Sequence, residues 1–132
     1  MNSLEIACFG ASEKGIASTL YLCYSLPELL DQVGYPPPET RGIYYAVQAL
    51  LYQHGLIFIP VVSEGYSYED YILGFRKLLE RESVNPLAAI CLPGVGSEVI
   101  MAAASKTCFV KKSLLITSEA DLYDYLTEKR AA

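Results

Sequence analysis

The chain has 132 residues, 52% of them hydrophobic and 19% charged, and its net charge is −5 at pH 7. This length favours one domain around a single core, and the composition excludes an intrinsically disordered protein. The acidic balance argues against a nucleic-acid partner, because a sequence-independent grip on phosphates needs many Lys and Arg, but it allows a locally basic pocket for one small phosphorylated ligand.

The first third of the chain predicts one strand and two helices. Residues 4–9 are a short apolar run that predicts a buried strand, and a turn follows at Gly10-Ala11-Ser12. Residues 13–24 place apolar side chains at helical spacing, which predicts a helix. The capping-box pattern from Ser25 to Glu28 then predicts a second short helix that ends near Gly34.

Residues 42–63 contain no Lys, Arg, Asp or Glu and are long enough to span a bilayer. We nevertheless expect no membrane segment, because Gln53-His54-Gly55 and Pro60 interrupt the apolar run. The pattern predicts a helix over residues 42–54 with Gly55 as its C-terminal cap, and a buried strand over 56–62.

The rest of the chain alternates between helices and strands. In chain order we predict an amphipathic helix capped by Ser67, a strand at 87–92, a glycine-containing turn at 93–97 and an Ala-rich helix at 98–106. A strand at 113–117 follows, and then a final helix capped by Ser118 with Lys129-Arg130 in its last turn. Strands joined by short helical crossovers favour parallel pairing. We therefore expect residues 1–132 to form a three-layer, Rossmann-like α/β domain with a small, mostly parallel sheet of about four strands.

Ligands of open parallel sheets bind beyond the carboxyl ends of the strands, so the residues that follow the predicted strands are candidates for a site. These are Gly10, Ser12, Lys14, Ser63, Glu64, Tyr66, Gly94, Gly96, Ser97, Thr117 and Ser118.

The turn from Pro93 to Ser97 is the strongest of these candidates. A glycine-rich turn between a buried strand and a helix can direct backbone N–H groups at a phosphate or carboxylate. A plain tight turn, in which Ser97 only caps the helix, explains the same residues. The turn over residues 10–15 occupies the equivalent place after the first strand, where Lys14 can add a positive charge, although it lacks the spacing of a P-loop.

Catalytic residues are less clearly indicated. His54 is the only histidine, and its place before Gly55 favours an interaction with the carbonyl end of a helix. Glu64 and Glu98 follow strands and are candidates for a general acid or base, although surface carboxylates are common.

The cysteines suggest a reducing compartment. They have neither CxxC spacing nor a histidine at zinc-ligand spacing, so we expect no metal site, and no cofactor is indicated. Most lie in apolar runs, where a thiol behaves as a small buried hydrophobe. The N-terminal sequence lacks the basic region of a signal peptide, and we expect a cytoplasmic protein.

The predicted helix at 42–54 also has an aromatic face. Tyr44, Gln48 and Tyr52 recur at i, i+4 and i+8, with Tyr45 beside them, and the chain has 11 tyrosines. Tyrosine is enriched at protein interfaces. A second hypothesis is therefore an interaction or scaffold module that forms a homo-oligomer through Tyr44, Tyr45 and Tyr52.

Several segments, taken in order, resemble the LOG and lysine-decarboxylase-like Rossmann family: GIYYAV at 42–47, GLIFIP at 55–60, Phe75-Arg76-Lys77, and AICLPGVGS at 89–97. In that family a GLMGAV-type helix leads to a strand ending in Pro, an Arg-Lys pair follows, and a PGGxGT turn binds nucleotide phosphate. The resemblance implies a nucleotide-like ligand near Arg76, Gly94, Gly96 and Ser97.

Other positions depart from the family pattern. Residues 35–38 replace a glycine-rich strand, the turn has one glycine fewer, and Ile100 stands at the position of the catalytic carboxylate, with Glu98 two positions away. Our leading hypothesis is thus a domain that binds a nucleotide or phosphorylated metabolite with little or no catalysis. A third hypothesis is a nucleoside-monophosphate N-glycosidase that uses a displaced acid, Glu98 or Glu64.

Overall fold

The computed structural model describes residues 4–83 and 85–128. Lys129-Arg130, which we predicted for the last turn of the final helix, lie outside the described residues.

In the described part of the chain, five strands form one sheet in the order β2-β3-β1-β4-β5. The central strand β1 (Glu5–Gly10) is parallel to β3 (Gly55–Pro60) and to β4 (Leu87–Cys91), and β4 is parallel to β5 (Leu114–Ile116). The edge strand β2 (Tyr21–Cys23) is antiparallel to β3. The expected small, mostly parallel sheet is confirmed, with one strand more than we predicted.

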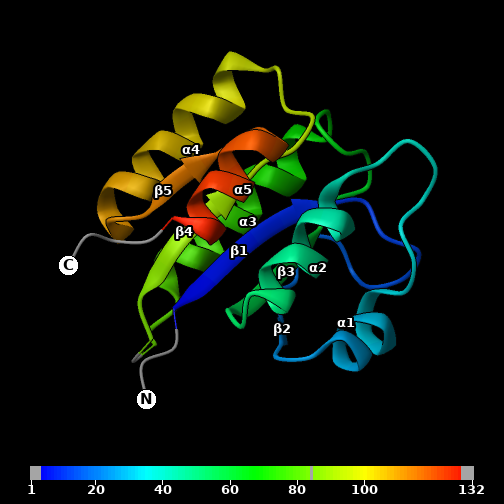
Figure 1. Ribbon diagram of the computed structural model, residues 1–132. Helices are drawn as coiled ribbons and strands as arrows, with labels where there is room; N and C mark the ends of the chain where they lie inside the picture. The colour runs from blue at the N-terminus through cyan, green and yellow to red at the C-terminus, as the bar shows by residue number, and fades with distance from the viewer. Residues whose placement is uncertain (1–3, 84, 129–132) are drawn as a thin grey trace.

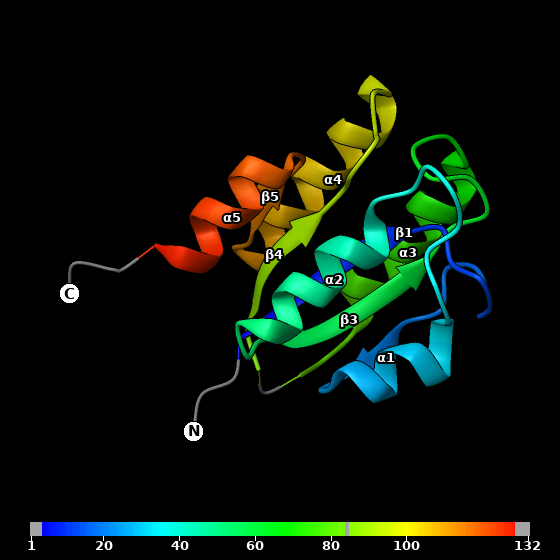
Figure 2. The ribbon, with the colours of Figure 1, turned by 45° about the vertical axis from the view of Figure 1, so that its right-hand side comes forward.

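Helices cover both faces of this sheet. One face packs against α1 (Leu26–Val33), α2 (Gly42–Leu51) and α5 (Glu119–Thr127), and the other face packs against α3 (Tyr68–Glu80) and α4 (Glu98–Lys111). Figure 1 shows α2 and α5 in front of the strands with α3 and α4 behind them, and Figure 2 shows the same layers from an oblique angle. The molecule is therefore an α/β fold with a hydrophobic core on each face of the sheet.

The predicted helix over residues 13–24 is wrong. Residues 11–20 form a loop that leads into β2, and two of its residues, Gly15 and Ser18, have positive φ angles of 108° and 63°. A right-handed helix cannot pass through such residues. Ile16, which we placed on the buried side of that helix, is 71% exposed.

Other boundaries follow the local signals. The hydroxyls of Ser25, Ser97 and Ser118 each accept a hydrogen bond from the amide three residues later, as capping predicts. Ser67 does not cap α3, because its hydroxyl bonds to the backbone of Ser63. Gly55 is the first residue of β3 rather than a helix cap.

The charge-free run at 42–63 divides as predicted into α2 and β3. Within residues 4–83 and 85–128, no helix has the length and apolar character needed to cross a membrane.

Helix α2 lies very close to β1. A Cβ atom added at Gly10 would meet the Cα of Gly42 at 2.6 Å, and one added at Gly42 would meet the Phe9 carbonyl oxygen at 2.9 Å. Two glycines facing each other thus bring the start of α2 onto the carboxyl end of the central strand. This contact places the first amides of α2 at the rim of the sheet.

The amino end of β1 carries a buried ion pair. The Glu5 side chain is almost completely buried, and its Oε1 lies 2.9 Å from Nη1 of Arg81, which follows α3 as its C-terminal cap. The Tyr24 hydroxyl also donates to Glu5 Oε2, at 3.4 Å. These partners compensate for the cost of removing the carboxylate from water.

Candidate functional site

The carboxyl end of β1 is the point where the order of the parallel strands reverses. The chain leaves β1 for β3 on one side, and later enters β4 on the other side. In open α/β sheets, ligands generally bind at the rim near this switch point. In this chain the loop after β1 and the Pro93–Ser97 turn after β4 lie on either side of it.

Glu64 occupies one half of this rim. Its Oε1 accepts hydrogen bonds from the amides of Ala11, at 2.9 Å, and Gly42, at 3.2 Å, and its Oε2 accepts from the amide of Arg41, at 2.6 Å. The side chain reaches these amides from the loop after β3. The protein's own carboxylate therefore fills the anion site at the start of α2.

The other half of the rim is open. Gly94 and Gly96 are exposed, and a Cβ atom added at Gly96 would meet nothing within 4 Å. No hydrogen bond is found for the amides of Gly94 and Gly96 in residues 4–83 and 85–128. These amides precede α4, whose N-terminus carries a partial positive charge. The turn is therefore a candidate anion site that no protein group in the described part of the chain occupies.

Glu64 also borders this open half. A Cβ atom added at Gly94 would lie 3.8 Å from Glu64 Cγ and 4.0 Å from its Oε2. The Gly94 carbonyl contacts Gly65 closely, and the Gly65 amide donates to the Tyr71 hydroxyl at 2.7 Å. The loops after β1, β3 and β4 are thus joined around a single carboxylate.

The structure brings together only some of the predicted site residues. Gly10, Gly94, Gly96 and Ser97 lie at the rim, and the Ser97 hydroxyl caps α4. Arg76 is exposed in the third turn of α3, about 12 Å along the helix axis from its first residue. That distance carries it away from the rim towards the amino end of the sheet.

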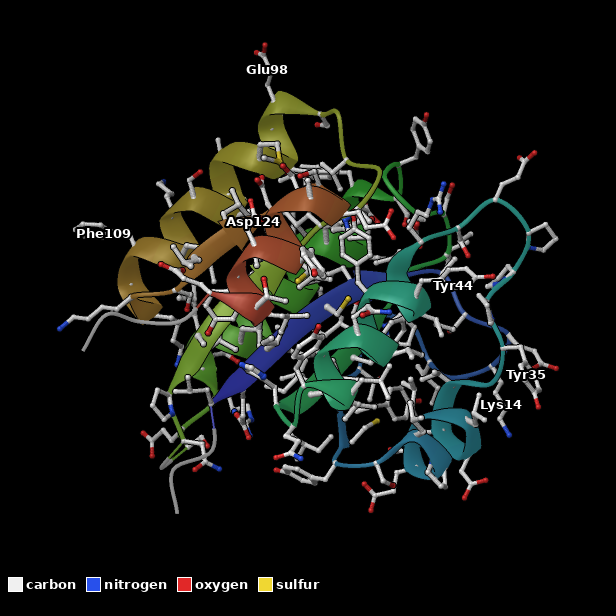
Figure 3. The ribbon with its side chains drawn as sticks, viewed as in Figure 1. Lys14, Tyr35, Tyr44, Glu98, Phe109 and Asp124 are labelled. Carbon is white, nitrogen blue, oxygen red and sulfur yellow. The ribbon has the colours of Figure 1, made fainter. Side chains whose placement is uncertain are left out.

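Lys14 does not reach the glycine turn. Its amide donates to the carbonyl of Val33 at 3.0 Å, and its own carbonyl accepts the Ser12 hydroxyl at 2.7 Å. These bonds hold the loop against the end of α1. Figure 3 shows Lys14 beside Tyr35, far from Glu98, which directly follows the Pro93–Ser97 turn.

The residues proposed for acid–base chemistry are poorly placed for it. His54 precedes β3 and so lies at the opposite end of the sheet, where Nδ1 is 3.2 Å from the Tyr52 carbonyl oxygen. This contact agrees with the predicted interaction at the end of a helix. Burial lowers the pKa of His54. Glu98 points away from the body of the molecule (Figure 3).

The predicted aromatic surface is smaller than expected. Tyr44 and Tyr52 are 53% and 41% exposed, but Tyr45 is only 5% exposed and belongs to the hydrophobic core. Burial raises the pKa of Tyr45 to about 12. On a helix the next residue points about 100° away, so Tyr45 faces the sheet when Tyr44 faces solvent.

Neither protein-family models nor curated proteins nor solved structures match this chain. In the described part of the chain, no three His, Cys, Asp or Glu side chains are grouped to hold a metal ion.

One feature of the rim could not be read from the sequence. We considered Glu64 as an acid or base because it follows a strand, but its role as acceptor for three amides depends on residues 11, 41 and 42, which are far away in the chain. The only available signal was that loops after neighbouring parallel strands meet at one edge.

Proposed function

We propose that this chain is a Rossmann-like domain that binds a small phosphorylated metabolite at the Pro93–Ser97 turn, with little or no catalysis. The observation that carries the proposal is the pair of exposed glycines, Gly94 and Gly96, whose amides have no hydrogen-bond partner in the described part of the chain, just before α4 and beside the switch point of the sheet. The family resemblance of the 42–47 and 89–97 segments points to the same turn.

The negative charge of Glu64 beside the turn restricts which ligands could bind there. A second anionic group beside this carboxylate would be repelled, whereas hydroxyl or amino groups could donate to its remaining lone pair. A sugar phosphate or nucleoside monophosphate, with one phosphate and several hydroxyls, matches this arrangement. The phosphate would contact the turn, and a sugar hydroxyl would contact Glu64.

The rim favours binding over hydrolysis. A general acid must present a proton to the substrate, but both Glu64 oxygens accept hydrogen bonds from backbone amides. Glu98 points outwards, and Ile100 is buried under α4. The N-glycosidase hypothesis therefore has no suitably placed acid on the described rim.

The first experiment is a thermal-shift titration with inorganic phosphate, ribose 5-phosphate and AMP, with adenosine as the unphosphorylated control. A ligand that binds only the folded state stabilises it by RT ln(1 + [L]/Kd), about 2.7 kcal/mol at one hundred times Kd. We expect stabilisation that increases with the concentration of a phosphorylated compound and is weaker for adenosine. No shift with any of the three phosphorylated compounds would contradict the proposal.

A pair of variants locates the site. Gly96→Asp places a carboxylate over the turn, where there is open space, and we expect it to abolish the ligand-induced shift without changing the melting temperature of the free protein. Ser105→Asp adds the same charge to an exposed position of α4 and should leave binding intact. A shift that persists unchanged in Gly96→Asp would move the ligand away from this turn.

A further inference from the structure

Helix α4 has an apolar outer face that no described part of the chain covers. Val99, Phe109 and Val110 are 58%, 85% and 62% exposed, and Ala102 is exposed between them. Between residues 99 and 110 the only charged residue is Lys106. The opposite face of the helix already packs on the sheet through Ile100, Ala104 and Cys108. A helix that is apolar on both sides is typical of a buried element or an interface.

The residues of this outer face have the same spacing in both directions along the helix. Val99, Ala102, Lys106 and Phe109 are spaced so that they lie along one side of the helix. The row is symmetric about residue 104, because Val99 and Phe109 are five residues from that point and Ala102 and Lys106 are two. A copy of this helix running antiparallel would place Val99 against Phe109, and the small Ala102 against the aliphatic stem of Lys106.

The charges at the two ends of α4 complement each other in the same arrangement. Glu98 is exposed at the first residue, and Lys112 is exposed just past the last. Figure 3 shows Glu98 and Phe109 near opposite ends of α4, both pointing away from the sheet. In this register Glu98 of each copy lies about two residues, or about 3 Å along the axis, from the position opposite Lys112 of the other copy, which the long lysine side chain can span. Antiparallel packing would also oppose the two helix dipoles.

We propose that two copies of this chain associate through the outer face of α4, with the helices antiparallel across a two-fold axis that crosses this face midway between Ala102 and Lys106. Such an interface is isologous, because the same surface serves both subunits. Phe109 is its anchor. The interface lies on the opposite side of the molecule from Tyr44 (Figure 3), so it differs from the tyrosine surface that the sequence suggested.

Sedimentation equilibrium over a wide concentration range tests the proposal. We expect the wild-type chain to form a dimer and no larger species, and Phe109→Asp to weaken dimerisation at least tenfold. Because Phe109 is almost fully exposed, this variant should keep the wild-type circular dichroism and melting temperature at concentrations where both are monomeric. Tyr44→Glu, which adds a charge to the other surface, should leave the dimer unchanged.

A charge exchange tests the antiparallel orientation. Glu98→Lys alone and Lys112→Glu alone should each weaken the dimer severalfold, and the double variant should restore it, because the exchanged charges again face each other. A wild-type chain that stays monomeric at all concentrations would overturn the proposal. So would a dimer that withstands Phe109→Asp or is lost on Tyr44→Glu, and a double variant as weak as the two single changes combined would overturn the orientation.

Discussion

Two carboxylates at opposite ends of the sheet are held in contrasting ways. At the carboxyl rim, Glu64 is held by backbone amides of three residues, and its charge is balanced by peptide dipoles. At the amino end, Glu5 lies in the core and its charge is balanced by the guanidinium of Arg81. The first arrangement joins loops around a candidate site, whereas the second fixes the end of α3 to the central strand. Their substitution should therefore have different consequences.

Removing the partner of Glu5 should be costly. We expect Arg81→Met to lower the free energy of unfolding by about 3 kcal/mol, because it leaves a buried carboxylate with only the weak Tyr24 hydrogen bond. Urea denaturation measures this loss. The double variant Glu5→Met, Arg81→Met should recover most of it, since no buried charge then remains. Equal stability of the single and double variants would show that the unpaired Glu5 carboxylate is not costly in the core.

At the scale of elements, the rim depends on how closely α2 approaches β1. The two facing glycines let the first amides of the helix reach Glu64, and the loop after β3 supplies that side chain. The open turn before α4 has no comparable constraint. Backbone contact thus builds one half of the rim, and exposed backbone forms the other.

Two Gly→Ala substitutions distinguish these halves. At Gly10 the added methyl would meet the Gly42 backbone at 2.6 Å, and we expect a loss of about 3 kcal/mol in the free energy of unfolding. At Gly96 it would meet nothing within 4 Å, and we expect a change below about 0.5 kcal/mol. Chemical denaturation of both variants checks this, and similar losses at both positions would contradict the packing described for α2.

For the whole molecule, buried tyrosines and thiols make stability depend on alkaline pH. Burial raises the pKa of Cys23 and Cys108 to about 11 and that of Tyr45 to about 12, and it also raises the pKa of Tyr71. These groups ionise more easily in the unfolded chain. Above the unfolded pKa values, near 9 for the thiols and 10 for the tyrosines, the unfolded state binds fewer protons and stability falls as pH rises.

Urea titrations between pH 8 and pH 11 should show this decline. Each group contributes a slope of up to about 1.4 kcal/mol per pH unit within its window. Tyr45→Phe removes one ionising group, so its stability should fall less steeply above pH 10 than that of the wild type. A flat profile over this range would mean that the buried groups ionise as readily in the folded as in the unfolded chain.

The sequence was sufficient where a signal was local. Apolar runs located β1, β3, β4 and β5, and the serine caps located the starts of α1 and α5, because a strand core or a cap involves only adjacent residues. β2 was missed because Tyr21–Cys23 gains its order from pairing with β3, more than 30 residues later. The positive φ angles at Gly15 and Ser18 were equally invisible to apolar spacing.

The candidate site shows the same difference between local signals and contacts that depend on distant residues. The strand-to-helix turn at Gly94 and Gly96 was found from its own residues, and it lies at the rim. Lys14 and Arg76 were included because of their place in a pattern, but their positions depend on the loop contacts of α1 and on the direction of α3. The role of Glu64 required three separate loops to meet.

The burial of Cys8, Cys23, Cys91 and Cys108 has a practical consequence. A thiol-specific reagent must reach the sulfur and needs it as a thiolate, so these buried cysteines react only when the structure around them unfolds locally. The four side chains belong to β1, β2, β4 and α4. Time-resolved mass spectrometry of alkylated peptides would therefore report, without any engineered label, the order in which the central strands, the antiparallel edge and the long helix separate from the core.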